Sequence, residues 1–166
     1  KSSRSIILKS KSIIKIDPNT FNEFKSLTSL DLSNNDLNVI DLEAFANIPQ
    51  LTYLNVDSNG VKSIVNPKNV KLESLQTLDM SNNNLYTVDP SIFKAMENLR
   101  DLRMVGTIKH ILGNQFAMMP NLKNLTVTAS FQYMLNQRIF YGLPNLETLR
   151  FVASDLKDIE SDTFVN

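Results

Sequence analysis

The chain has 166 residues, of which 42% are hydrophobic, and its 17 basic residues balance 17 acidic residues. This balance disfavours a nucleic-acid or anionic-membrane partner, because no net charge draws the chain toward phosphate groups. The chain has no cysteine, which excludes disulfides, thiolate zinc sites and cysteine nucleophiles. No apolar run reaches the ~18 residues that cross a bilayer, so we expect no direct membrane insertion by this segment.

Leucine-rich segments follow one another along the chain, and they start near residues 3, 27, 51, 75, 99, 122 and 146. Five of the spacings are 24 residues and one is 23 residues. A period in this range, without helical or hairpin signals, is typical of a solenoid of stacked repeats. We therefore expect residues 1–166 to form a single repeat domain of about seven repeats.

Within a repeat, apolar residues recur 3, 5, 10, 13 and 18 positions after the start, as in the repeat from Leu27 to Phe45. Residues 29–33 alternate polar and apolar side chains, which predicts one short, half-buried strand per repeat. The remaining ~18 residues supply the long crossover that parallel neighbours need. The pattern predicts an α/β-type repeat solenoid with a parallel sheet on its concave face and irregular or short helical arcs on its convex side.

An asparagine follows the expected strand in the clearest repeats, at Asn35, Asn59 and Asn83. The chain bends there and leaves backbone groups without sheet partners, and an asparagine side chain has both donors and acceptors to satisfy them. We therefore interpret these residues as a buried structural ladder rather than as ligand-binding residues. The equivalent residues of the last three repeats have shorter side chains, which predicts a less regular C-terminal half: Thr107, Ser130 and Ser154.

The third and fifth repeats depart from the pattern. Asn69 replaces the late phenylalanine of the third repeat, and we expect Val70 and Leu72 to fill the space while the arc bulges on the convex side. The fifth repeat is one residue short, which a tightened turn near Gly106 explains. An irregularity shaped for a ligand is the alternative interpretation of the fifth repeat.

Side chains two, four, six and seven positions after each start are expected on the concave face. Adjacent strands lie about 4.8 Å apart, so six steps give a surface roughly 29 Å long, which is enough for a protein interface. The candidate ligand-binding residues on this face are Tyr53, Asn55, Asp57, Asp79, Asp101, Arg103, Val105, Arg150 and Val152.

These candidates suggest a charge gradient along the concave face. An acidic patch of Asp31, Asp57, Asp79 and Asp101 grades into an apolar and basic patch of Arg103, Val105, Arg150 and Val152. A partner with the opposite gradient would be steered into one register. Tyr53 has the character of an interface anchor, although an incidental exposed tyrosine is the alternative. Pairing with Asp79 explains Arg103 as well as ligand binding does.

Asn124 begins the chain's one Asn-x-Ser/Thr triplet and is a candidate glycosylation site. Its position two residues after a repeat start places it on the concave face. A glycan there would block the sixth repeat and shift protein contacts toward the N-terminal strands or another face.

The sequence offers no catalytic residues. It has one histidine, His110, and four widely separated glycines, so neither a nucleophile with its base nor a phosphate-binding loop can be assembled. Three acidic residues alternate near the C-terminus, and we interpret them as solvated arc residues rather than calcium ligands: Asp158, Glu160 and Asp162. We expect no enzyme activity, no metal site and no cofactor.

The stretch from Leu27 to Phe45 resembles the extracellular, 24-residue "typical" class of leucine-rich repeat, and the resemblance covers nearly the whole chain. The polar, Asn- and Ile-rich composition is similar to that of Toll-type receptor ectodomains and insect leucine-rich immune proteins. This resemblance implies a non-catalytic recognition module of an extracellular receptor in innate immunity, which binds a protein or microbial ligand, or a co-receptor, on its concave face. The alternative is a cytoplasmic protein-interaction scaffold.

The chain departs from complete members of this class because it lacks Cys-rich flanks. We therefore expect a segment of a longer ectodomain without its caps. Uncapped ends would expose core residues and permit self-association, which is a third role to consider. The residues expected to be exposed there are Ile6, Ile16, Phe21, Phe151 and Phe164.

Overall fold

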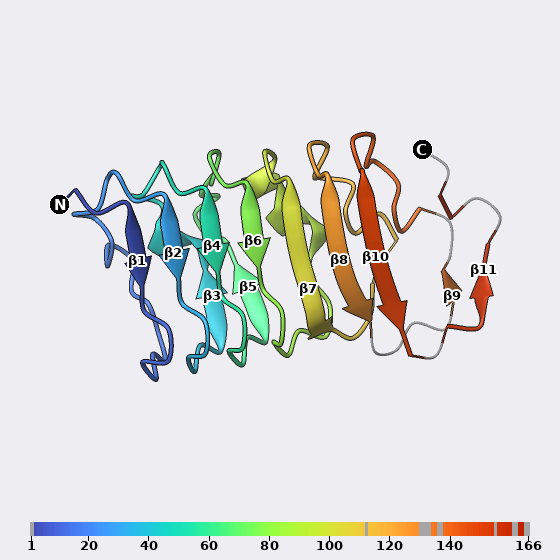
Figure 1. The fold of residues 1–166 in the computed structure, drawn as a ribbon, viewed down its shortest axis with the longest axis horizontal. Coiled ribbons are helices and arrows are strands. Elements are labelled where there is room, and N and C mark those ends of the chain that lie inside the picture. Colours follow the sequence, from blue (N-terminus) through green and yellow to red (C-terminus); the bar gives the residue numbers. More distant parts are fainter. Residues whose placement is uncertain are drawn as a thin grey trace.

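The computed structural model describes residues 2–111, 113–129, 134–135, 138–154, 156–160 and 163–164. Seven strands lie side by side in one parallel sheet, in the order β1, β2, β4, β6, β7, β8, β10 (Figure 1). Their bounds are Ser5–Ile7, Ser29–Asp31, Tyr53–Asn55, Thr77–Asp79, Asp101–Ile108, Asn124–Ala129 and Thr148–Ala153. The predicted parallel-sheet solenoid is confirmed.

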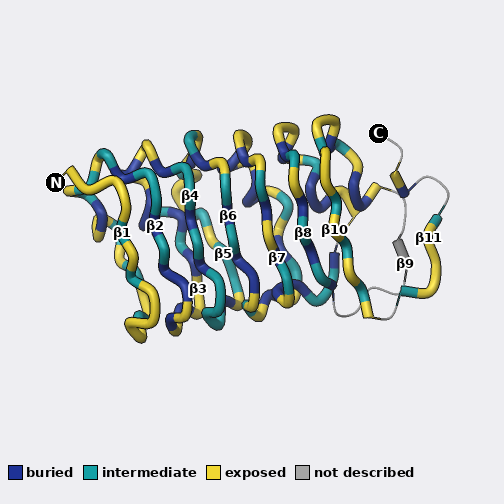
Figure 2. The backbone as a smooth tube through the Cα atoms, in the orientation of Figure 1, coloured by how far each residue is buried: buried dark blue, intermediate teal, exposed yellow. Residues whose placement is uncertain are grey.

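The pairing register of this sheet follows the repeat period. Leu30 pairs with Leu54, Leu54 with Leu78, and Leu78 with Leu102, each one repeat further along. Because equivalent positions face each other, apolar side chains of successive repeats stack into one continuous core, and the loops around it are exposed (Figure 2).

In the part of the chain that the structure describes, the arcs opposite the sheet carry only short elements, as the repeat pattern predicted. Two small parallel sheets and two 3-10 helices lie there: β3 (Val39–Asp41) with β5 (Ser63–Val65), β9 (Met134–Leu135) with β11 (Asp158–Ile159), η1 (Leu42–Phe45) and η2 (Pro90–Met96). An aspartate caps each 3-10 helix. Asp41 Oδ1 accepts from the backbone N of Glu43 at 3.0 Å, and Asp89 Oδ1 accepts from the backbone N of Ser91 at 2.8 Å. Among the described residues, no helix has the length and hydropathy required to span a bilayer.

A column of phenylalanine rings runs through the arc side of the core. Ring centroids are separated by 6.5 Å for Phe21 and Phe45, 6.4 Å for Phe93 and Phe116, 6.3 Å for Phe116 and Phe140, and 5.7 Å for Phe140 and Phe164. The expectation that Phe21 is exposed at an open end is wrong, because its ring stacks on Phe45 and is only 3% exposed. Phe164, by contrast, is 61% exposed.

The phenylalanine column is interrupted in the third repeat. Asn69 is exposed and has a left-handed backbone (φ 52°), while Leu72 is buried and Val70 is half-buried. Asn66 clamps this arc, because its Oδ1 accepts from Val70 N at 2.7 Å and its Nδ2 donates to Val70 O at 3.0 Å. The replacement residues fill the site only in part and leave a surface hollow of about 550 Å³ between the third and fourth arcs.

The asparagine after each early strand links neighbouring repeats. Asn59 Nδ2 donates to Leu32 O at 3.1 Å and to Val56 O at 3.0 Å, while its Oδ1 accepts from Leu37 N at 3.1 Å. The side chains of Asn35 and Asn83 make the equivalent bonds one repeat before and one repeat after. These bonds supply partners for backbone groups that the sheet leaves unpaired.

Only part of this pattern continues in the C-terminal half. Thr107 replaces the asparagine in the fifth repeat, and its hydroxyl donates to Met80 O at 2.6 Å. Ser154 is exposed in the seventh repeat, and Ser130 lies outside the described residues.

The residue just before the ladder position has a left-handed backbone in the first five repeats. The φ angles are 55° for Ser10, 53° for Asn34, 53° for Ser58, 50° for Asn82 and 63° for Gly106. The sequence analysis did not identify this column, although serine, asparagine and glycine recur in it. The equivalent residues of the last two repeats are alanines, and both lie within the extended strands β8 and β10.

Candidate functional site on the concave face

Two rows of side chains cross the C-terminal half of the concave sheet. The first row is Arg103, Thr126 and Arg150, which pair in register across β7, β8 and β10. The second row is Val105, Thr128 and Val152, in which Thr128 and Val152 pair in register. These six residues line a hollow of about 400 Å³, which we call the concave hollow.

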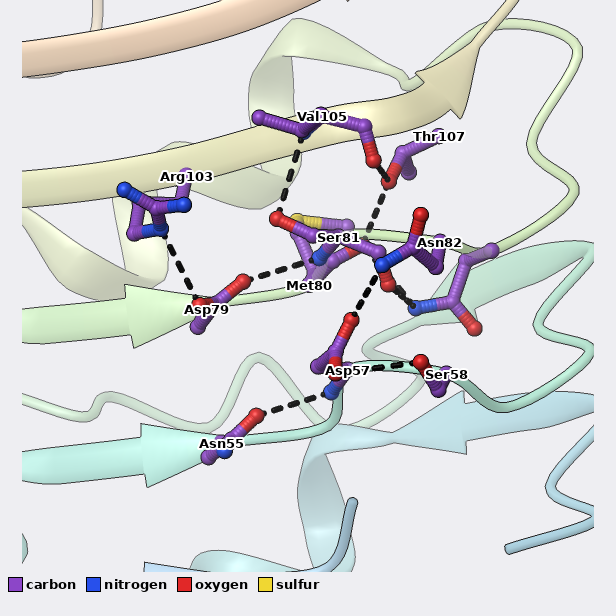
Figure 3. Close-up of polar contacts among 11 residues, drawn as sticks. Asn55, Asp57, Ser58, Asp79, Met80, Ser81, Asn82, Arg103, Val105 and Thr107 are labelled. Atoms are coloured by element: carbon purple, nitrogen blue, oxygen red, sulfur yellow. Dashed lines mark hydrogen bonds and ion pairs between the residues drawn. The ribbon is translucent and has the colours of Figure 1, made fainter. Parts of the chain in front are cut away.

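Arg103 is held by its neighbour on β6. Its Nε donates to Asp79 Oδ2 at 3.1 Å, and the other oxygen of this carboxylate accepts from Ser81 N at 3.0 Å (Figure 3). The side chain of Arg103 is 55% exposed, so the pair contributes at most about 1 kcal/mol to stability. The structural role foreseen for Arg103 is therefore present, and its charge is largely compensated.

Arg150 differs from Arg103 in this respect. It is exposed on the last strand of the main sheet, and no described residue forms an ion pair or hydrogen bond with its guanidinium. A guanidinium has five N–H donors in a planar arrangement that matches carboxylate and phosphate groups. Among the described residues, Arg150 thus has no partner that compensates its charge, in contrast to Arg103.

The second row gives the hollow an apolar side. Val152 is 47% exposed, and Val105 is half-buried. Val105 N donates to Ser81 Oγ at 3.2 Å, which fixes the backbone where β7 departs from regular register (Figure 3). Thr126 and Thr128 contribute half-buried side chains that the sequence analysis did not select, although they occupy the same two repeat positions as the selected residues.

The remaining candidate residues lie outside this hollow, and several support local turns. Asn55 Oδ1 accepts from Asp57 N at 2.9 Å. The carboxylate of Asp57 accepts from Asn82 Nδ2 at 2.8 Å and from Ser58 Oγ at 3.0 Å (Figure 3). The side-chain oxygens of Asn55 and Asp57 are thus already engaged within the chain.

Tyr53 begins β4 and is half-buried. Burial, together with the nearby carboxylates of Asp31 and Asp79, raises the pKa of its hydroxyl above the usual value. Tyr53 is therefore protonated at neutral pH and can donate a hydrogen bond from the concave face.

Asn124 begins β8, is exposed, and donates from Nδ2 to Asp101 Oδ1. Asp101 also accepts from Thr77 Oγ1 at 3.4 Å. Asn124 lies two residues before Thr126 on the same strand, next to the concave hollow.

Two expected concave positions are buried. Ser33 is 2% exposed and Ser81 is 4% exposed, so their predicted display to solvent is wrong. Their backbone N atoms donate to the carboxylates of Asp31 and Asp79, at 2.9 and 3.0 Å, as the chain turns away from the strand. The left-handed residue that follows each serine completes this turn.

A second set of asparagines, which the sequence analysis missed, lies at the opposite rim of the sheet. Asn98, Asn121 and Asn145 each donate from Nδ2 to a backbone carbonyl of the preceding repeat, at 2.9, 3.0 and 2.9 Å. The recurring Asn-Leu at three repeat starts is the signal that could have found them. Their hydrogen bonds give them a structural role.

The described residues do not bring together three or more histidine or carboxylate side chains that could hold a metal ion. Asp162 of the acidic C-terminal group lies outside these residues. The centroid of the His110 ring lies 5.1 Å from that of the Tyr86 ring, and His110 is not among the residues that line the concave hollow.

Two family profiles match the chain. "Leucine rich repeat" matches residues 3–61, and "BspA type Leucine rich repeat region (6 copies)" matches residues 58–166. Human Toll-like receptor 3 is 29% identical over 156 residues, which cover 86% of this chain. The chain spans only 17% of the length of that receptor.

Solved structures agree with this fold. The structure of a TLR13-ssRNA13 complex matches with a TM-score of 0.83 at 24% identity, over 98% of this chain and 23% of that chain. The leucine-rich repeat domain of APL1B matches with a TM-score of 0.69 at 21% identity, over 95% and 46% of the two chains. A leucine-rich repeat protein of Leptospira interrogans matches with a TM-score of 0.70 at 22% identity, over 93% and 45%. The chain belongs to the leucine-rich repeat family, and it is similar to Toll-type receptor ectodomains.

Proposed function

We propose that this chain is a non-catalytic recognition segment of an extracellular receptor in innate immunity, and that it binds a protein or microbial ligand on its concave face. The observation that carries the proposal is the concave hollow, where Arg150, which pairs with none of the described residues, lies beside two partly exposed valines. Similarity to human Toll-like receptor 3 supports the receptor setting.

The distribution of charge favours a protein ligand over nucleic acid. The TLR13 structure of similar fold is a complex with ssRNA13, so a nucleic-acid ligand is the natural rival. This chain has no net positive charge, and carboxylates of Asp31, Asp57 and Asp79 lie along the rest of the concave strip. A polyanion that follows the strip would meet these carboxylates at close range.

The test is retention of ligands from the extracellular fluid that surrounds the native protein. The fluid is passed over immobilised wild-type chain, over a Tyr53→Ala/Arg103→Glu variant, and over a Lys94→Ala variant as a convex-side control. We expect mass spectrometry to show ligands retained by the wild type and by the control, and retained severalfold less by the concave variant. Equal retention by all three proteins would place the binding site away from the concave face.

The extracellular setting has its own test at Asn124. Peptide mass spectrometry of the native protein shows whether this residue carries a glycan. An occupied site would establish passage through the secretory pathway and exclude the cytoplasmic scaffold. It would also count against ligand binding in the concave hollow, because the glycan would lie on β8, the central strand of the hollow, and would confine concave contacts mainly to the first five repeats.

A further inference from the structure

We infer that the group bound in the concave hollow is a carboxylate side chain on an extended protein segment, with an apolar side chain two residues away. This inference rests on the proposed concave-face function and names the chemistry of its ligand. It follows from the two rows of the hollow, their spacing, and the different states of the two arginines.

The two rows have different chemistry. Thr126 lies between Arg103 and Arg150 on neighbouring strands, so one row presents guanidinium and hydroxyl donors. Thr128 lies in the other row, whose outer members Val105 and Val152 are partly exposed valines. A ligand that fills the hollow therefore needs an acceptor over the first row and an apolar group over the second.

The spacing of the rows matches an extended peptide. Members of the two rows are two residues apart on the same strand, and two residues of a β-strand span about 6.8 Å. In an extended ligand segment, side chains i and i+2 point to the same face and have the same spacing. An acidic residue at i and an apolar residue at i+2 would thus meet the first and second rows together.

The arginines set the charge that the ligand carries. Arg103 is already paired with Asp79, so within the described part of the chain the hollow has one uncompensated positive charge, on Arg150. One carboxylate neutralises this charge, and a bidentate arginine contact suits its planar shape. A phosphate chain would need several cations, and beyond Arg103 the first row continues with Asp79 on β6.

The experiment is selection of a phage-displayed random peptide library on the immobilised 166-residue chain. Peptides that enrich are synthesised, and their Kd values, together with that of a mixed-sequence single-stranded RNA oligonucleotide, are measured by isothermal titration calorimetry for wild type, Arg150→Gln, Tyr53→Ala and Arg100→Gln. Arg100 is a matched control, because it is an exposed arginine one position after a repeat start and lies outside the hollow. Circular dichroism and urea unfolding establish that the variants are folded.

We expect enriched peptides to share Asp or Glu followed two residues later by an apolar residue. Arg150→Gln should weaken their binding about tenfold, and Arg100→Gln should leave it unchanged. Replacing the peptide's acidic residue with its amide should weaken binding to wild type by the same factor and should change binding to Arg150→Gln little. The reason is that the two changes remove the same interaction.

Four outcomes would overturn the inference. The enriched peptides could lack an acidic residue, and their Kd values could change with Tyr53→Ala but not with Arg150→Gln. This result would reject the carboxylate ligand and leave the proposed concave-face function standing. Absence of enriched peptides, or binding unaffected by every concave variant, would reject both. A mixed-sequence single-stranded RNA oligonucleotide that binds more tightly than any peptide and depends on Arg150 would identify a polyanion ligand instead.

Discussion

The N-terminal and C-terminal halves of the sheet are built from the same repeat but end their strands differently. Strands β2, β4 and β6 have three residues each, whereas β7 has eight and β8 and β10 have six. In the first group a left-handed residue and a ladder asparagine turn the chain away, and Ser33 and Ser81 are buried in that turn. In the second group the strand continues and Val152 is 47% exposed. The loss of the asparagine turn accompanies the opening of the concave hollow.

The largest expected effect concerns the phenylalanine column, which is continuous only in the C-terminal half. Phe116→Ala should destabilise the chain by about 3–5 kcal/mol, because the ring is fully buried between Phe93 and Phe140. Phe45→Ala should cost about 1 kcal/mol less, because Asn69 replaces the next ring of the column. Urea unfolding measures both values, and an equal or larger loss for Phe45→Ala would remove the distinction between the halves.

The next effect compares the ladder with its replacement. Asn59→Ala should cost about 3 kcal/mol, because it removes several bonds to backbone groups that have no sheet partner. Thr107→Val should cost about 1 kcal/mol, since it removes a single hydroxyl donor, which lies 2.6 Å from Met80 O and 3.2 Å from Val105 O. Asn38→Ala is an exposed control with one weak contact of 3.4 Å. If Thr107→Val lowered the free energy of unfolding as much as Asn59→Ala, threonine would stabilise its repeat as strongly as the asparagine does.

Backbone conformation gives a smaller and opposite pair of effects. Gly106→Ala should destabilise by about 1–2 kcal/mol, because φ is +63° and the new Cβ would lie 3.2 Å from Asn82 Oδ1. Ser58→Gly should be neutral or stabilising by up to about 1 kcal/mol, because Ser58 has a left-handed backbone. Thermal unfolding of both variants is the measurement. Destabilisation by Ser58→Gly would indicate that the contact of the Ser58 hydroxyl with Asp57 outweighs the backbone strain.

The two concave arginines should differ in their contribution to stability. Arg103→Gln should lower the free energy of unfolding by at most about 1 kcal/mol, and less at high salt, because its exposed pair with Asp79 is screened. Arg150→Gln should leave it unchanged, since no described residue pairs with Arg150. Urea unfolding of the two variants at low and high salt measures this difference. A salt-sensitive loss of unfolding free energy in Arg150→Gln would show that its guanidinium has a partner.

Tyr53 provides the smallest expected effect, on alkaline stability. Its pKa is raised in the folded state by burial and by Asp31 and Asp79, so the folded chain holds the proton more tightly than the unfolded chain. The corresponding stability is present below the unfolded value of about pH 10 and is lost as pH rises through the folded pKa. Unfolding midpoints should therefore fall more steeply above about pH 10 in wild type than in Tyr53→Phe. Parallel curves would show that this residue is not coupled to folding.

The fold could be predicted because the repeat period carries it. Leucines 24 residues apart, such as Leu30, Leu54 and Leu78, pair with one another as the period requires. The concave hollow could be predicted in part, since Arg103, Val105, Arg150 and Val152 differ from the residues that recur at the same positions in the other repeats. The sequence did not show that Arg103 is paired and that Arg150 has no described partner. Arg103 is paired because Asp79 lies in register with it on β6. Arg150 lies on β10, the last strand of the main sheet as described, so no further strand places a residue beside it.

The burial of Ser33 and Ser81 was not predictable from alternation alone. Strict alternation assumes that the strand continues, whereas these serines lie where the chain already turns back onto the carboxylates of Asp31 and Asp79. The left-handed residues Asn34 and Asn82 follow these serines in the turn, whereas Ala129 continues strand β8. This difference is a backbone preference rather than a hydrophobic pattern.

The most direct measurement blocks each half of the concave face in turn. The chain has no cysteine, so a single introduced cysteine can be labelled uniquely with a bulky maleimide. Thr128→Cys places the label in the concave hollow, and Asn55→Cys places it on the N-terminal half. We predict that the label at Thr128→Cys abolishes retention of the ligand captured from extracellular fluid, while the label at Asn55→Cys reduces it only slightly. Loss of retention from the label at Asn55→Cys, with full retention from the label at Thr128→Cys, would contradict the assignment of ligand binding to the C-terminal half.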